Sequence, residues 1–196
     1  MKRVLLLGDS IRQNYQEYVK AELEGIAEVC FPNDNGKFGY LTLRYCHEWI
    51  KVLTPEGKAP FDVVHFNVGL WDVLRLSNED RTFTSEEEYA LLLKRISDRI
   101  RFYLPNAKQI FALSTSVIEP GFEPGELYGK RCNSDIERFN QIAKEVFSDT
   151  DVTINDLWSI SQTLSKEARS DLVHFDTQEG RTALGKAVVK ATKTYL

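Results

Sequence analysis

Residues 4–15 read VLLLGDSIRQNY and join a short apolar run to a segment with helical spacing. The run is continuous rather than alternating, which is typical of a strand buried on both faces of a sheet. Ser10 lies at the junction between this strand and the helix. A hydroxyl at that place either caps the helix, by accepting a backbone N–H of the first turn, or serves as a nucleophile. The second interpretation requires a base, an orienting acid and oxyanion donors elsewhere in the chain.

Three further runs have the character of buried strands: AEVCF at 27–31, FDVVHFNV at 61–68 and KQIFALSTS at 108–116. Segments with helical spacing alternate with these runs, at 11–24, 41–53, 85–104, 133–147 and 177–196. The segment at 85–104 opens with a serine and three acids, which is the pattern of a capped helix start. The alternation predicts a three-layer α/β domain with about five parallel strands and helices on both faces.

Size and charge limit the possible functions. The 196 residues, 42% of them hydrophobic, are enough for one well-buried core, so we expect a single domain over 1–196. The net charge is −4 and the cations are scattered among acids, which argues against nucleic acid as a partner. No apolar run approaches the roughly 20 residues of a membrane span, and residues 4–7 are too few for a signal-peptide core. We therefore expect a cytoplasmic protein with no membrane partner.

Cysteines and histidines give no metal pattern. Cys30, Cys46 and Cys132 are odd in number and lack a CxxC spacing, so neither a disulfide framework nor a zinc site is expected. His47 lacks the second histidine of a zinc-binding HExxH helix, and His65 lies inside an apolar strand, where a core histidine is expected. The sequence implies no metal ion.

Near the other end of the chain, residues 170–176 read SDLVHFD and place Asp171 three residues before His174. At this spacing in a helical turn both side chains project from one side, so the carboxylate can hold the Nδ1–H of the imidazole while Nε2 faces a hydroxyl. With Ser10 this makes a candidate Ser-His-Asp triad. The alternative for the lone motif is a surface turn or a capped helix start.

The carboxyl ends of parallel strands form the usual ligand crevice, and several polar segments emerge there. They are Gly8-Asp9-Ser10, the stretch NVGLWD at 67–72 and the Pro- and Gly-rich loop at 114–130. GDS, NVGLWD and DLVHF, in that order, resemble the SGNH (GDSL-type) hydrolase family over nearly the whole chain. The resemblance implies a flavodoxin-like fold. It also implies that Ser10 is the nucleophile, that Asp171 and His174 complete the triad, and that the Ser10 N–H forms part of the oxyanion hole.

Two oxyanion signatures of this family are less regular here. The glycine expected after the second strand is either Gly36 or Gly39, and we assign Gly39 because it precedes a helix-like stretch with unused N–H groups. A plain turn glycine is the alternative for each. The third signature has Trp71 where the family has an asparagine. Asn67 faces the same way as Gly69 on an extended strand and is the predicted replacement donor, the alternative being an amide that ties down the strand end. The resulting N-x-G-x-W pattern resembles polysaccharide O-acetyl-transferring and esterase relatives.

Other side chains near these motifs have two interpretations. Trp71, Phe122 and Tyr128 either line the crevice and stack on a sugar ring or simply pack at the edge of the core. Asp9 is expected to hydrogen-bond the loop behind Ser10, and Asp72 is expected to act as a cap.

The sequence thus predicts a serine hydrolase that cleaves a carboxylic ester through an acyl-enzyme without a cofactor. A short acyl group such as acetate on a carbohydrate is the expected substrate. A thioesterase or lysophospholipase is an alternative, although it needs an apolar channel and residues 121–132 are polar. A catalytically weak carbohydrate-binding relative is a further alternative. A nucleotide-binding protein is disfavoured, because residues 8–15 lack a Gly-rich cradle or a P-loop lysine.

Overall fold

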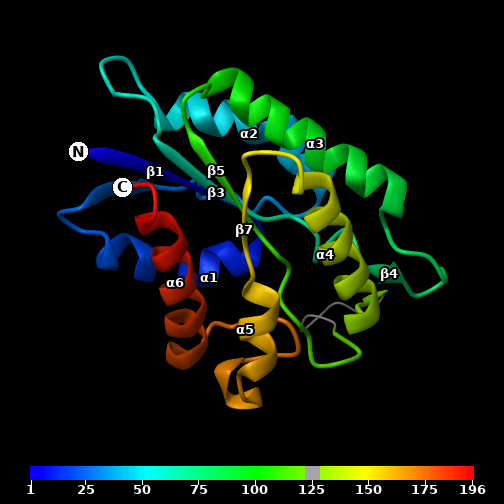
Figure 1. The fold of residues 1–196 in the computed structure, drawn as a ribbon. Coiled ribbons are helices and arrows are strands. Elements are labelled where there is room, and N and C mark those ends of the chain that lie inside the picture. The colour runs from blue at the N-terminus through cyan, green and yellow to red at the C-terminus, as the bar shows by residue number, and fades with distance from the viewer. Residues whose placement is uncertain (122–128) are drawn as a thin grey trace.

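The structure is a computed structural model that describes residues 1–121 and 129–196 (Figure 1). Its centre is a parallel sheet with the strand order β2-β1-β3-β5-β7. The strands are β1 Lys2–Leu7, β2 Ala27–Cys30, β3 Val63–Phe66, β5 Lys108–Ala112 and β7 Thr153–Asn155. This is the flavodoxin-like order, so the predicted fold is confirmed.

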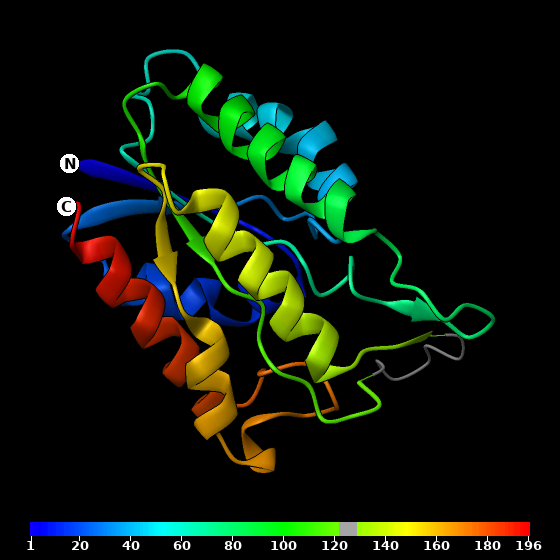
Figure 2. The same ribbon diagram turned by 45° about the vertical axis from the view of Figure 1, so that its right-hand side comes forward.

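Helices cover both faces of the sheet (Figures 1 and 2). In the described residues they are α1 Ser10–Glu22, α2 Gly39–Leu53, α3 Glu86–Tyr103, α4 Asn133–Phe147, α5 Leu157–Thr163 and α6 Gln178–Lys193, with a 3₁₀ turn, η1, at Lys166–Ala168. On one face α3 packs between α2 and α4, and on the other α1 packs against α6, which also contacts α5. None of these helices combines the length and hydrophobicity that a bilayer crossing requires.

Local sequence signals account for most of these elements. The side chains of Val4 to Leu7 are fully buried, as a strand covered on both faces must be. The predicted cap of α3 is a capping box, in which the Ser85 hydroxyl accepts the Glu88 N–H at 3.2 Å and the Glu88 carboxylate accepts the Ser85 N–H at 3.1 Å. The sequence pattern therefore fixes both the centre of the sheet and the start of its longest helix.

Other elements were not predicted from the sequence. They are β7, α5 and a small antiparallel pair, β4 Arg75–Leu76 with β6 Gly129–Lys130. Each is too short to show a periodicity. The strand expected over 108–116 ends at Ala112, because the Ser114 N–H donates to the side chain of Asn140 on α4 instead of to a neighbouring strand.

The start of α6 lies close against the backbone around η1. A Cβ built on Gly180 falls 2.2 Å from the carbonyl oxygen of Ala168 and 2.9 Å from that of Phe175. Only glycine permits this approach, since real Cβ atoms do not come so near to backbone oxygens. The two carbonyls flank the segment that carries Asp171 and His174, so Gly180 sets where that segment lies.

Gly180→Ala is expected to lower the free energy of unfolding by about 1–3 kcal/mol, because the new methyl group must displace backbone. Denaturant unfolding measures this loss. Lys186→Ala, an exposed substitution on the same helix, is the control and should change stability by no more than about 0.5 kcal/mol. Equal stability of the Gly180→Ala variant and the parent would contradict this account of the packing.

Candidate active site

The turn after β1 places Ser10 at the carboxyl ends of the strands. Gly8 has φ +152°, and a Cβ built on it falls 2.0 Å from Oδ1 of Asn67, so a side chain at this position is excluded. Asp9 is the N-cap of α1 and accepts the Ile11 N–H at 3.0 Å. The capping interpretation of Ser10 is therefore wrong: Asp9 caps, and Ser10 is the first residue of the helix.

The three predicted triad residues lie together. Ser10 Oγ is 2.8 Å from His174 Nε2, and His174 Nδ1 is 2.7 Å from Asp171 Oδ2. An ionised carboxylate only accepts hydrogen bonds, so Nδ1 carries the proton that faces Asp171 and, in the neutral ring, Nε2 accepts from the Ser10 hydroxyl. The side chains of His174 and Asp171 are 15% and 12% exposed, which leaves this chain of hydrogen bonds at the surface of the domain.

Asp171 is held in its charged form. Its partial burial raises the pKa, but hydrogen bonds from the His174 N–H, the His174 ring and the Val173 N–H outweigh burial and leave the pKa below its ordinary value. Both N–H groups donate to Oδ1 at 2.7 Å, while Oδ2 faces the imidazole. The Asp-x-x-His spacing thus lets one carboxylate fix the turn and the ring together.

Arg169, which no sequence pattern indicated, braces the segment that carries Asp171 and His174. The guanidinium of Arg169 donates to the carbonyl oxygen and the hydroxyl of Ser116, at 2.7 and 2.8 Å, and lies 3.9 Å from the ring centre of Phe175. The Ile118 N–H donates to the Leu172 carbonyl at 2.8 Å. Burial lowers the pKa of Arg169 to about 10, and nearby Asp171 opposes that shift. A lone arginine before the motif gave no signal of this role.

Asn67 bonds to the turn that precedes Ser10. Its Nδ2 donates to Asp9 Oδ1 at 2.8 Å, and both side chains are almost fully buried. Burial raises the pKa of Asp9, although the hydrogen bonds from Asn67 and Ile11 oppose the shift. This contact matches the alternative of an amide that ties down the strand end. The role of Asn67 as an oxyanion donor stays a prediction. One hydrogen of its amide is bonded to Asp9, so the other would have to donate to the oxyanion.

The Gly39 N–H, predicted as an oxyanion donor, bonds to another group in this structure. The Gly39 N–H donates to both carboxylate oxygens of Asp72, each at 3.1 Å, because this buried anion attracts the first N–H of α2. Asp72 therefore caps α2 across the fold, as expected of it, and also accepts from the Thr84 hydroxyl at 2.8 Å. The other candidate, Gly36, donates its N–H to the Gly8 carbonyl at 2.9 Å.

The predicted aromatic residues divide into two groups. Trp71 is half-buried on the loop after β3, with Lys37 Nζ 5.8 Å and Arg131 Cζ 5.5 Å from its ring centre. Its contact with substrate stays a prediction. Phe122 and Tyr128 lie outside the described residues. The Arg131 guanidinium is fully buried and donates to the Leu70 carbonyl at 2.7 Å, which helps to hold the loop that carries Trp71.

The remaining histidines and the cysteines lie outside the triad. His65 is fully buried in β3 with Nε2 3.1 Å from Asn155 Nδ2, and burial lowers its pKa to about 3, as fits a neutral core residue. His47 on α2 lies 2.9 Å from an Arg99 nitrogen. The three cysteines are free thiols. Over residues 1–121 and 129–196, no group of three or more acidic, histidine or cysteine side chains is arranged to hold a metal ion.

Comparison with known proteins relates this geometry to a known fold. No protein-family model matches the chain, and no curated protein matches it. A lipase/acylhydrolase from Enterococcus faecalis has a TM-score of 0.74 at 19% identity, covering 99% of this chain and 96% of its own. The acetyl xylan esterase AlAXEase has a TM-score of 0.72 at 17% identity, covering 97% and 99%. A protein described as a GDSL-like lipase, from Parabacteroides merdae, has a TM-score of 0.72 at 13% identity, covering 98% and 95%.

These likenesses extend over nearly the whole chain and concern its fold. The chain shares the fold of these proteins, a flavodoxin-like α/β/α arrangement, as the sequence resemblance implied. The N-x-G-x-W subfamily pattern stays a prediction.

The buried carboxylate of Asp72 leads to a pH-dependent prediction. Burial raises its pKa to about 6, so the folded state binds a proton that the unfolded chain has already released, and stability falls as pH rises between about 4 and 6. Asp72→Asn cannot ionise. The stability of this variant relative to the parent is therefore expected to rise by about 2–3 kcal/mol across that range.

Urea unfolding of both proteins at several pH values measures this difference. Asp149→Asn, which alters an exposed carboxylate, is the matched control and should show no such trend. A difference between Asp72→Asn and the parent that does not change with pH would overturn the assignment of a raised pKa to Asp72.

Proposed function

We propose that this protein is an SGNH hydrolase that cleaves a carboxylic ester, with Ser10 as nucleophile, His174 as base and Asp171 as the orienting acid. The observation that carries the proposal is the continuous chain of contacts of 2.8 and 2.7 Å from the Ser10 hydroxyl through the imidazole to Asp171. The shared fold of lipases and esterases supports the same chemistry. The fold alone would not be enough to assign this function, because one scaffold serves many functions.

In this mechanism, His174 Nε2 takes the Ser10 hydroxyl proton as Oγ attacks the ester carbonyl carbon. The tetrahedral intermediate collapses, the alkoxide leaves with the proton from His174, and the acyl group stays on Ser10. A water molecule then gives a proton to His174 and attacks the acyl carbon. The acid departs, and Ser10 regains its proton. The ionised Asp171 stabilises the imidazolium in both halves.

The negative oxygen of the intermediate needs hydrogen-bond donors. As the first residue of α1, Ser10 has a backbone N–H that makes no bond within the helix. We assign this N–H as one donor and the second amide hydrogen of Asn67 as the other. The Gly39 N–H is left out of the assignment, because it is bonded to Asp72.

We further propose that the acyl group is short, acetate in the first instance, and that the alcohol is a carbohydrate. Trp71 with Lys37 beside it gives the loop after β3 an aromatic face and a hydrogen-bond donor, a combination that suits a sugar ring. An acetyl xylan esterase is among the proteins that share the fold. A panel of acetyl, butyryl and octanoyl p-nitrophenyl esters, with an acyl thioester, separates this activity from a lysophospholipase or thioesterase.

Ser10→Ala is expected to reduce kcat for p-nitrophenyl acetate by about 10⁴- to 10⁶-fold with an unchanged thermal midpoint, and His174→Ala to a comparable extent, since triad members act as a unit. Labelling by a fluorophosphonate should disappear in Ser10→Ala. Ser159→Ala, on α5, is the matched control and should keep full activity and labelling. A Ser10→Ala variant with a tenth of the parent activity would remove Ser10 as the nucleophile. No labelling of the parent would favour a binding protein.

Asn67→Ala distinguishes the two roles of this amide. If Asn67 donates to the oxyanion, kcat should fall by about 10²- to 10³-fold with little change in KM, because such a donor acts mainly in the transition state. Thermal unfolding measures the separate loss of the bond to Asp9. A variant with a lower midpoint but the parent's kcat would show that Asn67 only ties β3 to the turn.

A further inference from the structure

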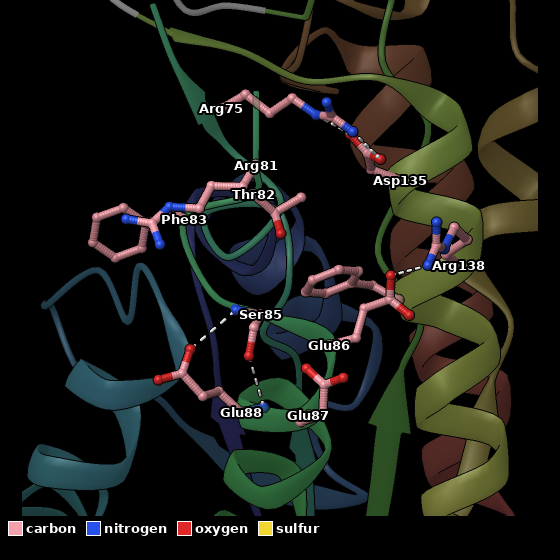
Figure 3. A pocket seen from close by; sticks show the side chains of 11 residues that line it. Arg75, Arg81, Thr82, Phe83, Ser85, Glu86, Glu87, Glu88, Asp135 and Arg138 are labelled. Carbon is pink, nitrogen blue, oxygen red and sulfur yellow. Dashed lines mark hydrogen bonds and ion pairs between the residues drawn. The ribbon is translucent and has the colours of Figure 1, made fainter. Parts of the chain in front are cut away.

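A cavity of about 610 Å³ lies between the first turn of α3 and the first half of α4 (Figure 3). Its walls come from the turn after β4, the first residues of α3 and the first half of α4. The volume is within the range of about 300–1,000 Å³ that is usual for small-ligand sites. Nothing in the proposed mechanism uses this space.

Ion pairs form one wall of the cavity. Arg75 holds Asp135 with two hydrogen bonds, at 2.7 and 2.8 Å, and Arg138 is paired with Glu86, as Figure 3 shows. The bidentate Arg75–Asp135 pair holds its donors and acceptors in one plane, and Arg75 Nη1 also donates to the Asp80 carbonyl at 2.6 Å. A guanidinium has five N–H donors and a carboxylate several lone pairs, so both pairs keep capacity to bind a ligand. Hydroxyl groups, which both donate and accept, suit such a wall.

The balance of charge argues against an anionic ligand. The lining has three arginines against four carboxylates, Glu86, Glu87, Glu88 and Asp135. The start of α3 does not serve as an anion site either, because the capping box between Ser85 and Glu88 occupies it. A neutral, hydroxyl-rich ligand fits this lining better than a phosphate or an acidic peptide.

An aromatic side chain completes the lining. Phe83 is 48% exposed, although it is large and apolar. Aromatic faces together with planar polar groups are suited to sugar rings, which have apolar C–H faces and a rim of hydroxyls. The phenyl ring of Phe83 also packs on that of Phe38 at 5.3 Å between ring centres, and Phe38 precedes Gly39 at the start of α2.

Hydrogen bonds join the chain at the cavity wall to the segment that follows Trp71. The Thr84 hydroxyl, next to Phe83, donates to Asp72 at 2.8 Å, and the Phe83 N–H donates to the Leu74 carbonyl at 2.7 Å. We propose that this cavity is a remote subsite that binds a neutral oligosaccharide segment of the ester substrate. That the bound oligosaccharide is part of the substrate rests on the proposed function. Binding of the oligosaccharide in the cavity does not depend on hydrolysis.

The test uses xylotetraose for binding and acetylated xylotetraose and p-nitrophenyl acetate for hydrolysis. Glu86→Ala with Arg138→Ala removes an ion pair whose side chains are 41% and 64% exposed, so the fold should tolerate it. We expect xylotetraose to bind the variant about tenfold more weakly in calorimetry, and the ratio of kcat/KM for acetylated xylotetraose to that for p-nitrophenyl acetate to fall by a similar factor. Phe83→Ala should have the same effect on binding.

The matched control is Arg101→Ala with Asp151→Ala, which removes an exposed ion pair involving the opposite end of α3 and should leave both measurements unchanged. Tetragalacturonate, an acidic oligosaccharide, should bind the parent more weakly than xylotetraose.

The two proposals fail in different ways. A parent enzyme that binds xylotetraose but cleaves neither ester would refute the proposed function and keep the neutral-glycan cavity. A parent enzyme that cleaves p-nitrophenyl acetate but does not bind xylotetraose would overturn the subsite. Equal binding by the parent and the Glu86/Arg138 variant, or tighter binding of tetragalacturonate, would also overturn it.

Discussion

The close contact between the ends of β1 and β3 determines the geometry of the proposed active site. The parallel register places Leu7 beside Phe66, so the residues that follow the two strands must pack together. Gly8 has no side chain, which leaves room for the side chain of Asn67. Asn67 in turn donates to Asp9, which caps α1. Ser10 is therefore directed by a neighbouring strand as much as by its own turn.

Three carboxylates near this edge have different environments and so different roles. Asp171 receives two backbone N–H groups and the imidazole, which keep its pKa low and its charge available to an imidazolium. Asp9 and Asp72 are buried, and their pKa values are raised. Asp9 and Asp72, whose ionisation is unfavourable, accept backbone N–H groups, and Asp171, whose ionisation is favourable, orients the imidazole of His174.

The sequence predicts those features that depend on residues close to one another along the chain. The buried strand before Ser10 and the Asp171–His174 pair are local patterns, and the strand order brings them together across 164 residues. The bond from Gly39 to Asp72 and the brace from Arg169 to Ser116 join segments that are distant in the chain. No spacing or composition marks such contacts, because they follow from how α2 and the loops pack on the finished sheet.

The same packing determines what the N–H groups of Gly39 and Gly36 bind. Gly39 begins α2, as the sequence indicated, but its N–H donates to Asp72, which also accepts from Thr84, the residue after Phe83 of the cavity wall. A few residues earlier, the Gly36 N–H bonds to the Gly8 carbonyl in the turn before Ser10. Hydrogen bonds therefore connect the cavity wall to the start of α2, and the segment that precedes α2 to the turn that holds Ser10. These contacts tie the chain near the cavity to the turn that orients Ser10, so under the proposed function the binding energy of an oligosaccharide at the cavity serves to position its ester.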